Sequence, residues 1–155
     1  MTFVKINRKM KLDGCDKMHR NKFIIRVRYG ETDQMGIAYN ANYLTWFEIG
    51  RTEFFRELGF TYKALEGKGV LLPLIEAYCK YINAARYDDE IEINTWVEEV
   101  KGVRIKFCYE LYRVEDGKLI ASGYTVHAFV NKELKPLNLK KVNEEVWNLF
   151  NKLSK

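Results

Sequence analysis

The second half of the chain contains three segments in which apolar and polar side chains alternate with period two, and this feature constrains the fold most. The segments are IEINTWVEEV (91–100), VRIKFCYELYRV (103–114) and KLIASGYTVHAFV (118–130). A period of two is that of a β-strand whose two faces have different surroundings. The connection between the second and third segments contains the Asp116-Gly117 pair, which is typical of a tight hairpin turn. We therefore expect consecutive antiparallel strands.

The first half of the chain predicts one strand and one long helix. The segment KFIIRVRY (22–29) alternates well enough for a strand that ends at Tyr29. Apolar residues then recur at helical spacing over residues 43–58. Asn42 is placed to cap the start of this helix, and Gly59 stands where a helix end favours positive φ.

The order of the expected elements indicates the fold class. An apolar strand broken by Pro73 lies within residues 70–84, and a last helix is expected near residues 143–153. One long helix followed by four antiparallel strands is an α+β architecture, in which a curved sheet of about five strands wraps the helix. We place this single domain at residues 20–155. Trp46 is expected at the edge of the helix or in a subunit contact.

The net charge of +5 is concentrated at the N-terminus. Residues 1–28 hold nine Lys or Arg and two Asp, whereas the rest of the chain holds 17 basic and 19 acidic side chains. This end lacks the apolar core of a secretory signal, and Met18 is a second plausible start. We interpret residues 1–19 as a loose basic extension, with a phosphate-binding arm as the alternative. We expect no nucleic-acid partner, and no apolar run approaches the length of a membrane span.

The cysteine and histidine content narrows the chemistry. Cys15, Cys79 and Cys108 form an odd count without a CxxC pair or a nearby His cluster. This pattern indicates a reducing cytoplasm and argues against a disulfide scaffold or a zinc site. Since His19 and His127 are the only histidines, we exclude a mechanism that requires a histidine pair. No metal or redox cofactor is expected.

The segment between the first strand and the long helix carries a family resemblance. RYGETDQMGIAYNANYLTWFEIGRTE (28–53) resembles the signature of the 4-hydroxybenzoyl-CoA thioesterase branch of the hotdog-fold acyl-CoA thioesterases. GVLLPLIEAYCKYINAARYDDEIEINTWV (69–97) and ASGYTVHAFVNKELKPLNL (121–139) resemble the same branch. The resemblance covers about residues 22–140. It implies a hotdog domain that hydrolyses an acyl-CoA to the free acid and CoA.

The resemblance also implies which residues act. Asp33, four residues after Tyr29 and three before Gly36, matches the family's catalytic carboxylate, which acts as a base or a nucleophile. The alternative is that Asp33 only bonds its own backbone in an Asx turn. The family's oxyanion donor is a backbone N–H at the helix entrance, which maps to Asn40; helix N-termini polarise carbonyls in this way. Tyr29 is expected to shape the loop and contact substrate.

The sequence departs from the family pattern at Asn40, and a Cys–His hydrolase is the rival enzyme mechanism. Many relatives carry His where Asn40 stands, so the backbone donor is retained while a His-assisted role is not. The side chain of Asn40 itself is compatible with a cap or turn. A hairpin centred on Asp116-Gly117 places His127 opposite Lys106 and Cys108 opposite Thr125. This register gives no support to a Cys–His hydrolase, and we expect His127 to be structural or to line a wall.

The remaining expectations concern substrate and assembly. CoA needs cations for its phosphates, and we select Lys101 and Arg104, with a merely solvated face as the alternative. The family forms dimers by pairing sheet edges, so we expect a homodimer or homotetramer with each site at a subunit boundary. A non-catalytic acyl-CoA-binding or regulatory hotdog protein is the rival function; a hotdog hydratase and nucleic-acid binding are weaker. The acyl group cannot be identified from the sequence.

Overall fold

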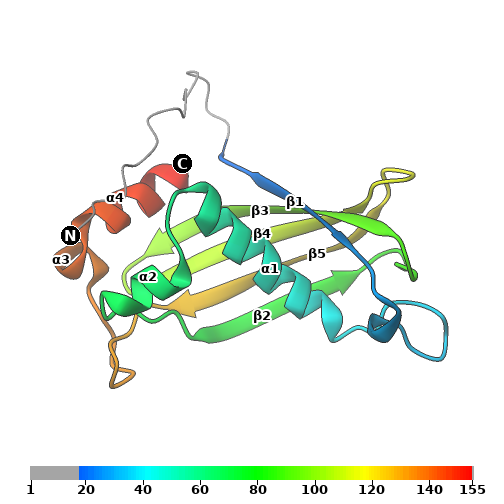
Figure 1. Cartoon of the computed structure of the whole chain (residues 1–155). Helices are drawn as coiled ribbons and strands as arrows, with labels where there is room; N and C mark the ends of the chain where they lie inside the picture. The colour runs from blue at the N-terminus through cyan, green and yellow to red at the C-terminus, as the bar shows by residue number, and fades with distance from the viewer. Residues whose placement is uncertain (1–17, 155) are drawn as a thin grey trace.

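The computed structural model describes residues 18–154. A twisted antiparallel sheet has the strand order β1-β3-β4-β5-β2, and α1 lies across one of its faces (Figure 1). The strands are β1 (Asn21–Arg26), β2 (Leu74–Tyr81), β3 (Glu90–Lys101), β4 (Arg104–Arg113) and β5 (Leu119–Ala128). The helices are α1 (Asn42–Glu57), α2 (Tyr62–Gly67), α3 (Leu139–Val142) and α4 (Glu144–Leu153), and a 3₁₀ turn, η1, spans Tyr29–Glu31. The predicted α+β architecture is confirmed.

The first strand is shorter than expected. β1 ends at Arg26, whose pairing partner is Glu90 on β3, and the chain then turns into η1 at Tyr29. Tyr29 is therefore not the end of a strand, and its side chain is 80% exposed. The strand was predicted to extend to Tyr29 because the alternation of apolar and polar residues continues to that point. The pairing with β3 ends earlier, at Arg26.

The face of α1 that meets the sheet is aromatic. Trp46, Phe47, Phe54 and Phe55 are fully buried, and the Phe47 ring stacks on Tyr109 of β4 with centroids 4.3 Å apart. The expected place of Trp46 at an edge or in a subunit contact is wrong. A Trp can lie this deep because its indole N–H finds a buried acceptor, a carboxylate described below.

The two ends of α1 differ in how they are formed. Asn42 is the first helical residue rather than the cap, a position that Ala41 occupies without a side-chain bond. The Asn42 side chain instead donates to the Glu31 carbonyl at 2.8 Å, so it ties the helix to the preceding turn. At the other end Gly59 has φ 86°, as the sequence predicts.

The β4–β5 hairpin has a different register from the one expected. The Arg113 N–H donates to the Lys118 carbonyl at 2.9 Å, so the turn is centred one residue earlier than Asp116-Gly117. A bulge then shifts the ladder by one residue next to Leu111. As a result His127 pairs with Ile105 rather than Lys106, and Cys108 pairs with Tyr124 rather than Thr125.

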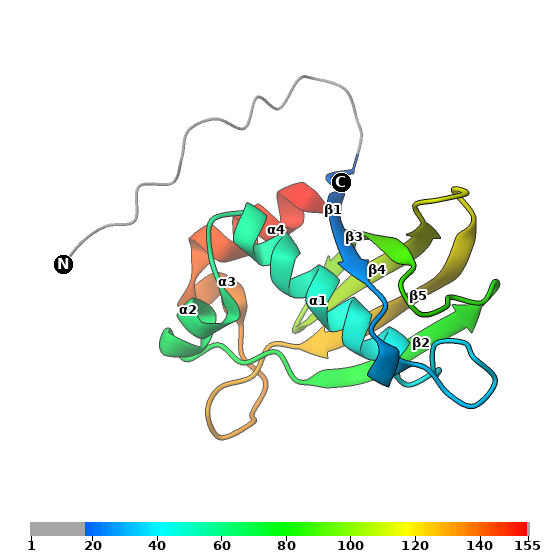
Figure 2. The same ribbon diagram turned by 45° about the vertical axis from the view of Figure 1, so that its right-hand side comes forward.

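Strand β2 forms a free edge of the sheet. Within residues 18–154 it pairs only with β5, and it runs toward the end of the molecule where α1 begins (Figures 1 and 2). Large apolar side chains on and just after it are between 44% and 53% exposed, namely Leu74, Ile75, Tyr78, Tyr81 and Ile82. An exposed edge with apolar side chains is suited to pairing with another strand.

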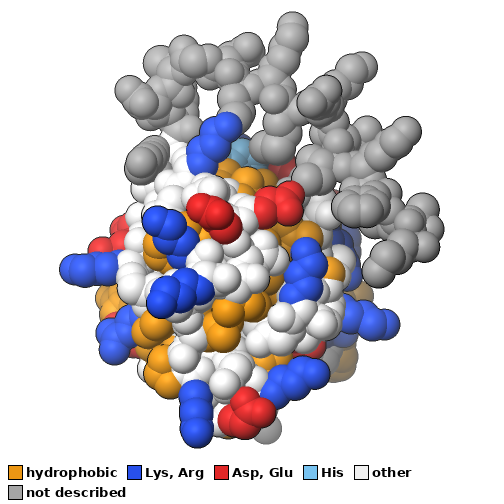
Figure 3. Space-filling view, turned by 90° about the vertical axis from the view of Figure 1, so that its left-hand side faces the viewer, with side chains coloured by type: hydrophobic (Ala, Val, Ile, Leu, Met, Phe, Trp, Pro, Cys, Tyr) orange, Lys and Arg blue, Asp and Glu red, His pale blue; other side chains and the backbone are white. Residues whose placement is uncertain are grey.

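The opposite end of the molecule carries α2, α3 and α4. On this face Lys and Arg side chains are interspersed with acidic and apolar ones (Figure 3). Residues 1–17, most of the predicted basic extension, lie outside the described residues, as does Cys15. His19 packs on α1, with its ring 5.8 Å from that of Phe54 and its Nε2 3.6 Å from the Glu57 carboxylate. Within residues 18–154 no helix is long and apolar enough to span a membrane.

Candidate active site

The loop between η1 and α1 is a small hairpin. Thr32 and Ala38 form a bridge, and the Asp33 N–H donates to the Ile37 carbonyl at 2.9 Å. Its turn uses Gly36 at φ 72°, a conformation that glycine adopts without steric cost. The hairpin projects at the end of the sheet where α1 begins (Figure 2). It therefore holds Asp33 at a fixed point close to the helix N-terminus.

The Asp33 carboxylate has both a structural bond and access to a cleft. Its Oδ1 accepts the Met35 N–H at 2.9 Å, which is an Asx turn. The residue is half-buried and lines a cleft beside the start of α1. A carboxylate has about four acceptor positions, so one N–H leaves capacity for water or substrate. The two sequence interpretations of Asp33 are thus compatible.

The cleft has a volume of about 260 Å³ and lies between the hairpin, the start of α1 and the end of β2. Its wall is largely apolar and aromatic, with contributions from Met35 and Ile82. Tyr43 and Tyr81, which both line it, meet edge to face with ring centroids 4.9 Å apart. An apolar wall with a few polar groups suits a compact organic group better than a polyanion.

Asn40 also lines this cleft, where the chain enters α1. The backbone N–H groups of Asn40 and Ala41 have no hydrogen-bond acceptor within residues 18–154. Such unpaired groups, together with the helix dipole, attract negative charge. The Asn40 carbonyl points elsewhere, since it accepts the Tyr81 hydroxyl at 3.0 Å and the Tyr43 N–H at 3.3 Å. The structure therefore brings Asp33 and Asn40 together in one cleft.

Tyr29 is not among the residues that line this cleft. Its exposed ring meets Tyr87 edge to face at 5.8 Å. The contact of Tyr29 with the loop is made by its carbonyl, which accepts the Thr32 hydroxyl at 2.7 Å and the Thr32 N–H at 3.2 Å. These bonds support the base of the hairpin.

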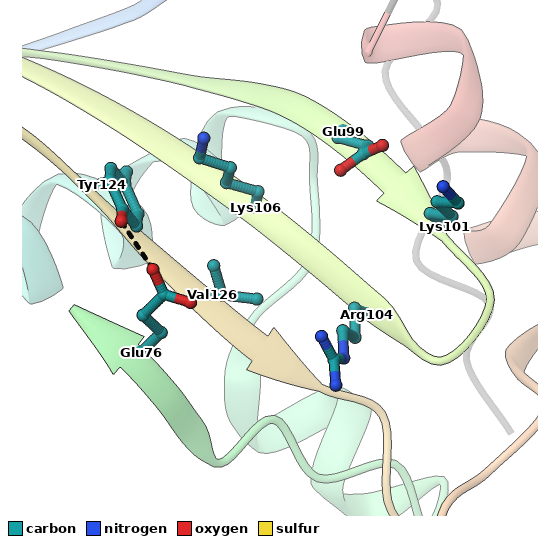
Figure 4. Close-up of a pocket in the computed structure, with 7 residues that line it drawn as sticks. All are labelled: Glu76, Glu99, Lys101, Arg104, Lys106, Tyr124 and Val126. Atoms are coloured by element: carbon teal, nitrogen blue, oxygen red, sulfur yellow. Dashed lines mark hydrogen bonds between the residues drawn. The ribbon is translucent and has the colours of Figure 1, made fainter. Parts of the chain in front are cut away.

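Lys101 and Arg104 lie at the β3–β4 turn and line a second cleft of about 520 Å³ (Figure 4). Arg104 faces away from α1, because the next residue, Ile105, is fully buried and side chains alternate along a strand. Lys106 in this cleft is paired with Glu98 at 2.6 Å, whereas Lys101 and Arg104 have no ion-pair partner within residues 18–154. Within one chain these cations and Asp33 belong to different clefts.

Glu31 is a buried acid that the sequence analysis did not select. Its side chain accepts the Arg28 N–H at 2.8 Å, the Arg28 guanidinium at 3.0 Å and the Trp46 indole N–H at 3.2 Å. Burial alone would raise the pKa of Glu31, but these hydrogen bonds together lower it below its ordinary value. The only sequence signal is the spacing of three between Arg28 and Glu31, which is also common on exposed turns.

A polar network in the core accounts for His127. The Arg51 guanidinium donates to the Tyr62 hydroxyl and, at 3.1 Å, to the Tyr109 hydroxyl, which bonds the Thr125 hydroxyl at 2.7 Å. Thr125 in turn bonds His127 Nε2 at 3.0 Å. Burial and the nearby Arg51 charge lower the pKa of His127 to about 4, so the ring is neutral near pH 7. His127 is not among the residues that line the cleft containing Asp33.

The rival Cys–His arrangement has no geometric basis. Cys108 is in register with Tyr124, and His127 with Ile105, so the two side chains lie on opposite faces of the sheet. Burial raises the pKa of the Cys108 thiol to about 12, which opposes thiolate formation. Within the described part of the chain Cys79 and Cys108 form no disulfide. Within residues 18–154 no group of three or more His, Cys, Asp and Glu is placed to hold a metal ion.

Comparison with known proteins finds thioesterase-like relatives over most of the chain. The family model described as the thioesterase-like superfamily matches residues 27–147. The putative acyl-CoA thioesterase YneP of Bacillus subtilis is 38% identical over 139 residues, which are 89% of this chain and 100% of that protein. The acyl-CoA thioester hydrolase YbgC of Escherichia coli O157:H7 is 30% identical over 76% of this chain and 87% of its own length.

Solved structures show the same fold. The DHNA-CoA thioesterase from Staphylococcus aureus superimposes with a TM-score of 0.82 and 30% identity, covering 86% of this chain and 90% of that one. The gentisyl-coenzyme A thioesterase BH1999 gives a TM-score of 0.72 and 27% identity, over 80% of this chain and 99% of that one. The chain therefore belongs to the thioesterase-like superfamily and has a hotdog fold.

Proposed function

We propose that this protein hydrolyses an acyl-CoA thioester to the free acid and CoA in the cleft between Asp33 and Asn40. The observation that carries the proposal is that the half-buried Asp33 and Asn40, whose N–H has no acceptor within residues 18–154, line one small, mainly apolar cleft. The acyl-CoA substrate is supported by the names of relatives that match most of the chain.

The chemistry follows from the two groups. The Asn40 N–H donates a hydrogen bond to the thioester carbonyl oxygen and stabilises the negative charge that develops there when the carbonyl carbon is attacked. As a general base, Asp33 takes a proton from the attacking water; the C–S bond then breaks, and the thiolate of CoA leaves and is protonated. As a nucleophile, Asp33 forms an acyl anhydride that water hydrolyses. Both routes consume one water and release the acid and CoA.

The substrate phosphates are assigned to Lys101 and Arg104 of a second copy. If two β2 edges pair antiparallel about a two-fold axis, the Tyr81 end of one strand lies beside the Leu74 end of the other. The Asp33 cleft of one copy then comes to the end of the dimer that carries the partner's basic turn. A homodimer, alone or doubled to a tetramer, thus unites the two clefts.

The acyl group is assigned to the aromatic class, as in the 4-hydroxybenzoyl-CoA branch. A volume of about 260 Å³ with Tyr43 and Tyr81 in its wall fits a single ring better than a long chain. Two of the solved relatives are named for aryl-CoA thioesters. The two free cysteines within residues 18–154 favour a cytoplasmic location.

A non-catalytic acyl-CoA-binding protein is the alternative, and one observation favours it. Asp33 already accepts the Met35 N–H, so its carboxylate has a structural use that requires no reaction. Under this alternative the same cleft holds the acyl group without turnover.

A thiol-release assay separates the two functions. Short, long, branched and aryl acyl-CoAs are compared with the wild type and the Asp33→Asn variant. We expect turnover that is fastest for an aryl substrate, and a loss of at least about 100-fold in kcat with KM within about threefold in the variant. Failure to release thiol from any of them, combined with tight acyl-CoA binding, would establish the binding protein.

A further inference from the structure

The side chain of Glu31 is buried outside the cleft, although it carries a charge. The residue is only 6% exposed, and its carboxylate accepts three N–H groups, two from Arg28 and one from Trp46. Burying a carboxylate without partners costs several kcal/mol, so this set of donors is what permits the charge to lie there. Trp46 is itself fully buried in α1. Glu31 is thus fixed to the helix.

The main chain of Glu31 fixes both ends of the hairpin that contains Asp33, the loop between η1 and α1. Its carbonyl accepts the Tyr39 N–H at 2.8 Å and the Asn42 side-chain amide at 2.8 Å. The Glu31–Tyr39 bond closes the hairpin below the Thr32–Ala38 bridge. Two residues after Glu31 comes Asp33, and directly after Tyr39 comes Asn40.

Outside its base the hairpin contacts the 84–86 segment, since the Ala38 N–H donates to the Ala85 carbonyl at 2.7 Å and the Arg86 guanidinium donates to the Gly36 carbonyl at 3.5 Å. Residues 34–36 at the tip are exposed, so the separation between Asp33 and the Asn40 N–H depends mainly on the base of the hairpin, where Glu31 lies. A displacement of about 1 Å in a reacting group costs on the order of 100-fold in rate. On the basis of the proposed function, we propose that Glu31 is a positioning residue that sets the distance between the Asp33 carboxylate and the Asn40 N–H.

The test is Glu31→Gln. A Gln amide keeps the shape but presents one acceptor oxygen where three N–H groups converge, so its NH₂ group faces a donor. We expect kcat to fall by about 10-fold to 100-fold while KM changes less than about threefold. The matched control is Glu90→Gln, which removes an exposed carboxylate paired with Arg26 at 2.8 Å and should leave kcat unchanged.

A double-mutant cycle separates positioning from general destabilisation. If Glu31 acts through the catalytic pair, Glu31→Gln should have little further effect on residual hydrolysis by Asp33→Asn. Trp46→Phe keeps the buried ring and removes one donor, so it should give a smaller fall in kcat if Glu31→Gln does not fold. Circular dichroism and urea unfolding report whether each variant is folded.

Three results have distinct meanings. If Asp33→Asn abolishes hydrolysis while folded Glu31→Gln and Trp46→Phe retain the wild-type kcat, the inference about Glu31 is wrong and the proposed function stands. If Asp33→Asn retains the wild-type kcat, the assignment of catalysis to Asp33 fails, and the inference about Glu31 fails with it. A full additional loss from Glu31→Gln in the Asp33→Asn background would show a structural role only.

Discussion

The neutral, buried His127 predicts a specific dependence of stability on pH. The residue is 1% exposed and its Nδ1 lies 3.0 Å from the Leu72 carbonyl, while Nε2 bonds Thr125. With Nδ1 protonated and donating to Leu72, Nε2 accepts the Thr125 hydroxyl. A second proton on Nε2 would break this bond and place a charge near Arg51.

The magnitude follows from the pKa of His127, which the fold lowers from 6.5 to about 4. Between these values the unfolded chain binds a proton that the folded chain does not, so the stabilisation is present above pH 6.5 and is lost as the pH falls toward 4. At about 1.4 kcal/mol per pKa unit the full loss is about 3 kcal/mol, of which about 2 kcal/mol falls between pH 7 and pH 5. Acidic residues with lowered pKa values, such as Glu31 and Glu92, lose their contribution at lower pH, below their ordinary value of 4.5.

Urea unfolding between pH 5 and pH 8 measures this loss. The matched variant is His127→Gln, which can bond Leu72 and Thr125 but does not titrate. We expect it to be less stable than the wild type at pH 7 and to lack most of the decline between pH 7 and pH 5. The same decline in the variant, or no decline in the wild type, would refute the assignment to His127.

Two further predictions concern packing and substrate. Gly123→Ala should lower the free energy of unfolding by about 1–3 kcal/mol in urea titrations, because a Cβ there would overlap the Tyr78 carbonyl and come within 2.8 Å of the Phe47 ring; Gly67→Ala, where nothing lies within 4 Å, should have no such cost. The Lys101→Ala, Arg104→Ala double variant should raise KM for an acyl-CoA several-fold without lowering kcat, and should leave KM for the matching acyl-pantetheine, which lacks the nucleotide phosphates, unchanged. Equal KM values for acyl-CoA in the double variant and the wild type would remove these cations from the substrate site.

Periodicity predicted the sheet and α1 well because both depend on which faces are buried. It did not predict the bulge beside Leu111, since an extra residue in one strand leaves the apolar pattern locally intact while shifting the partner by one. It also extended the first strand to Tyr29, where pairing with β3 has already ended.

The site could be predicted where the sequence matches the motif of the family that it resembles. That resemblance implied Asp33 and Asn40, and the fold places them in one cleft. Glu31 was not selected, and Trp46 was placed wrongly, for the same reason: a sequence does not show that two polar groups will satisfy each other in the core. Lys101 and Asp33 line different clefts of one chain. Whether they act on one substrate depends on how two copies of the chain assemble, which the sequence pattern does not show.

A crystal structure of the Asp33→Asn variant with a bound aryl-CoA would show whether the thioester lies in this cleft. We expect the thioester carbonyl carbon about 3–3.5 Å from the substituted side chain, or joined to it through one water, and the carbonyl oxygen about 3 Å from the Asn40 N–H. An acyl-CoA whose thioester lies away from this cleft in every copy of the assembly would contradict this placement.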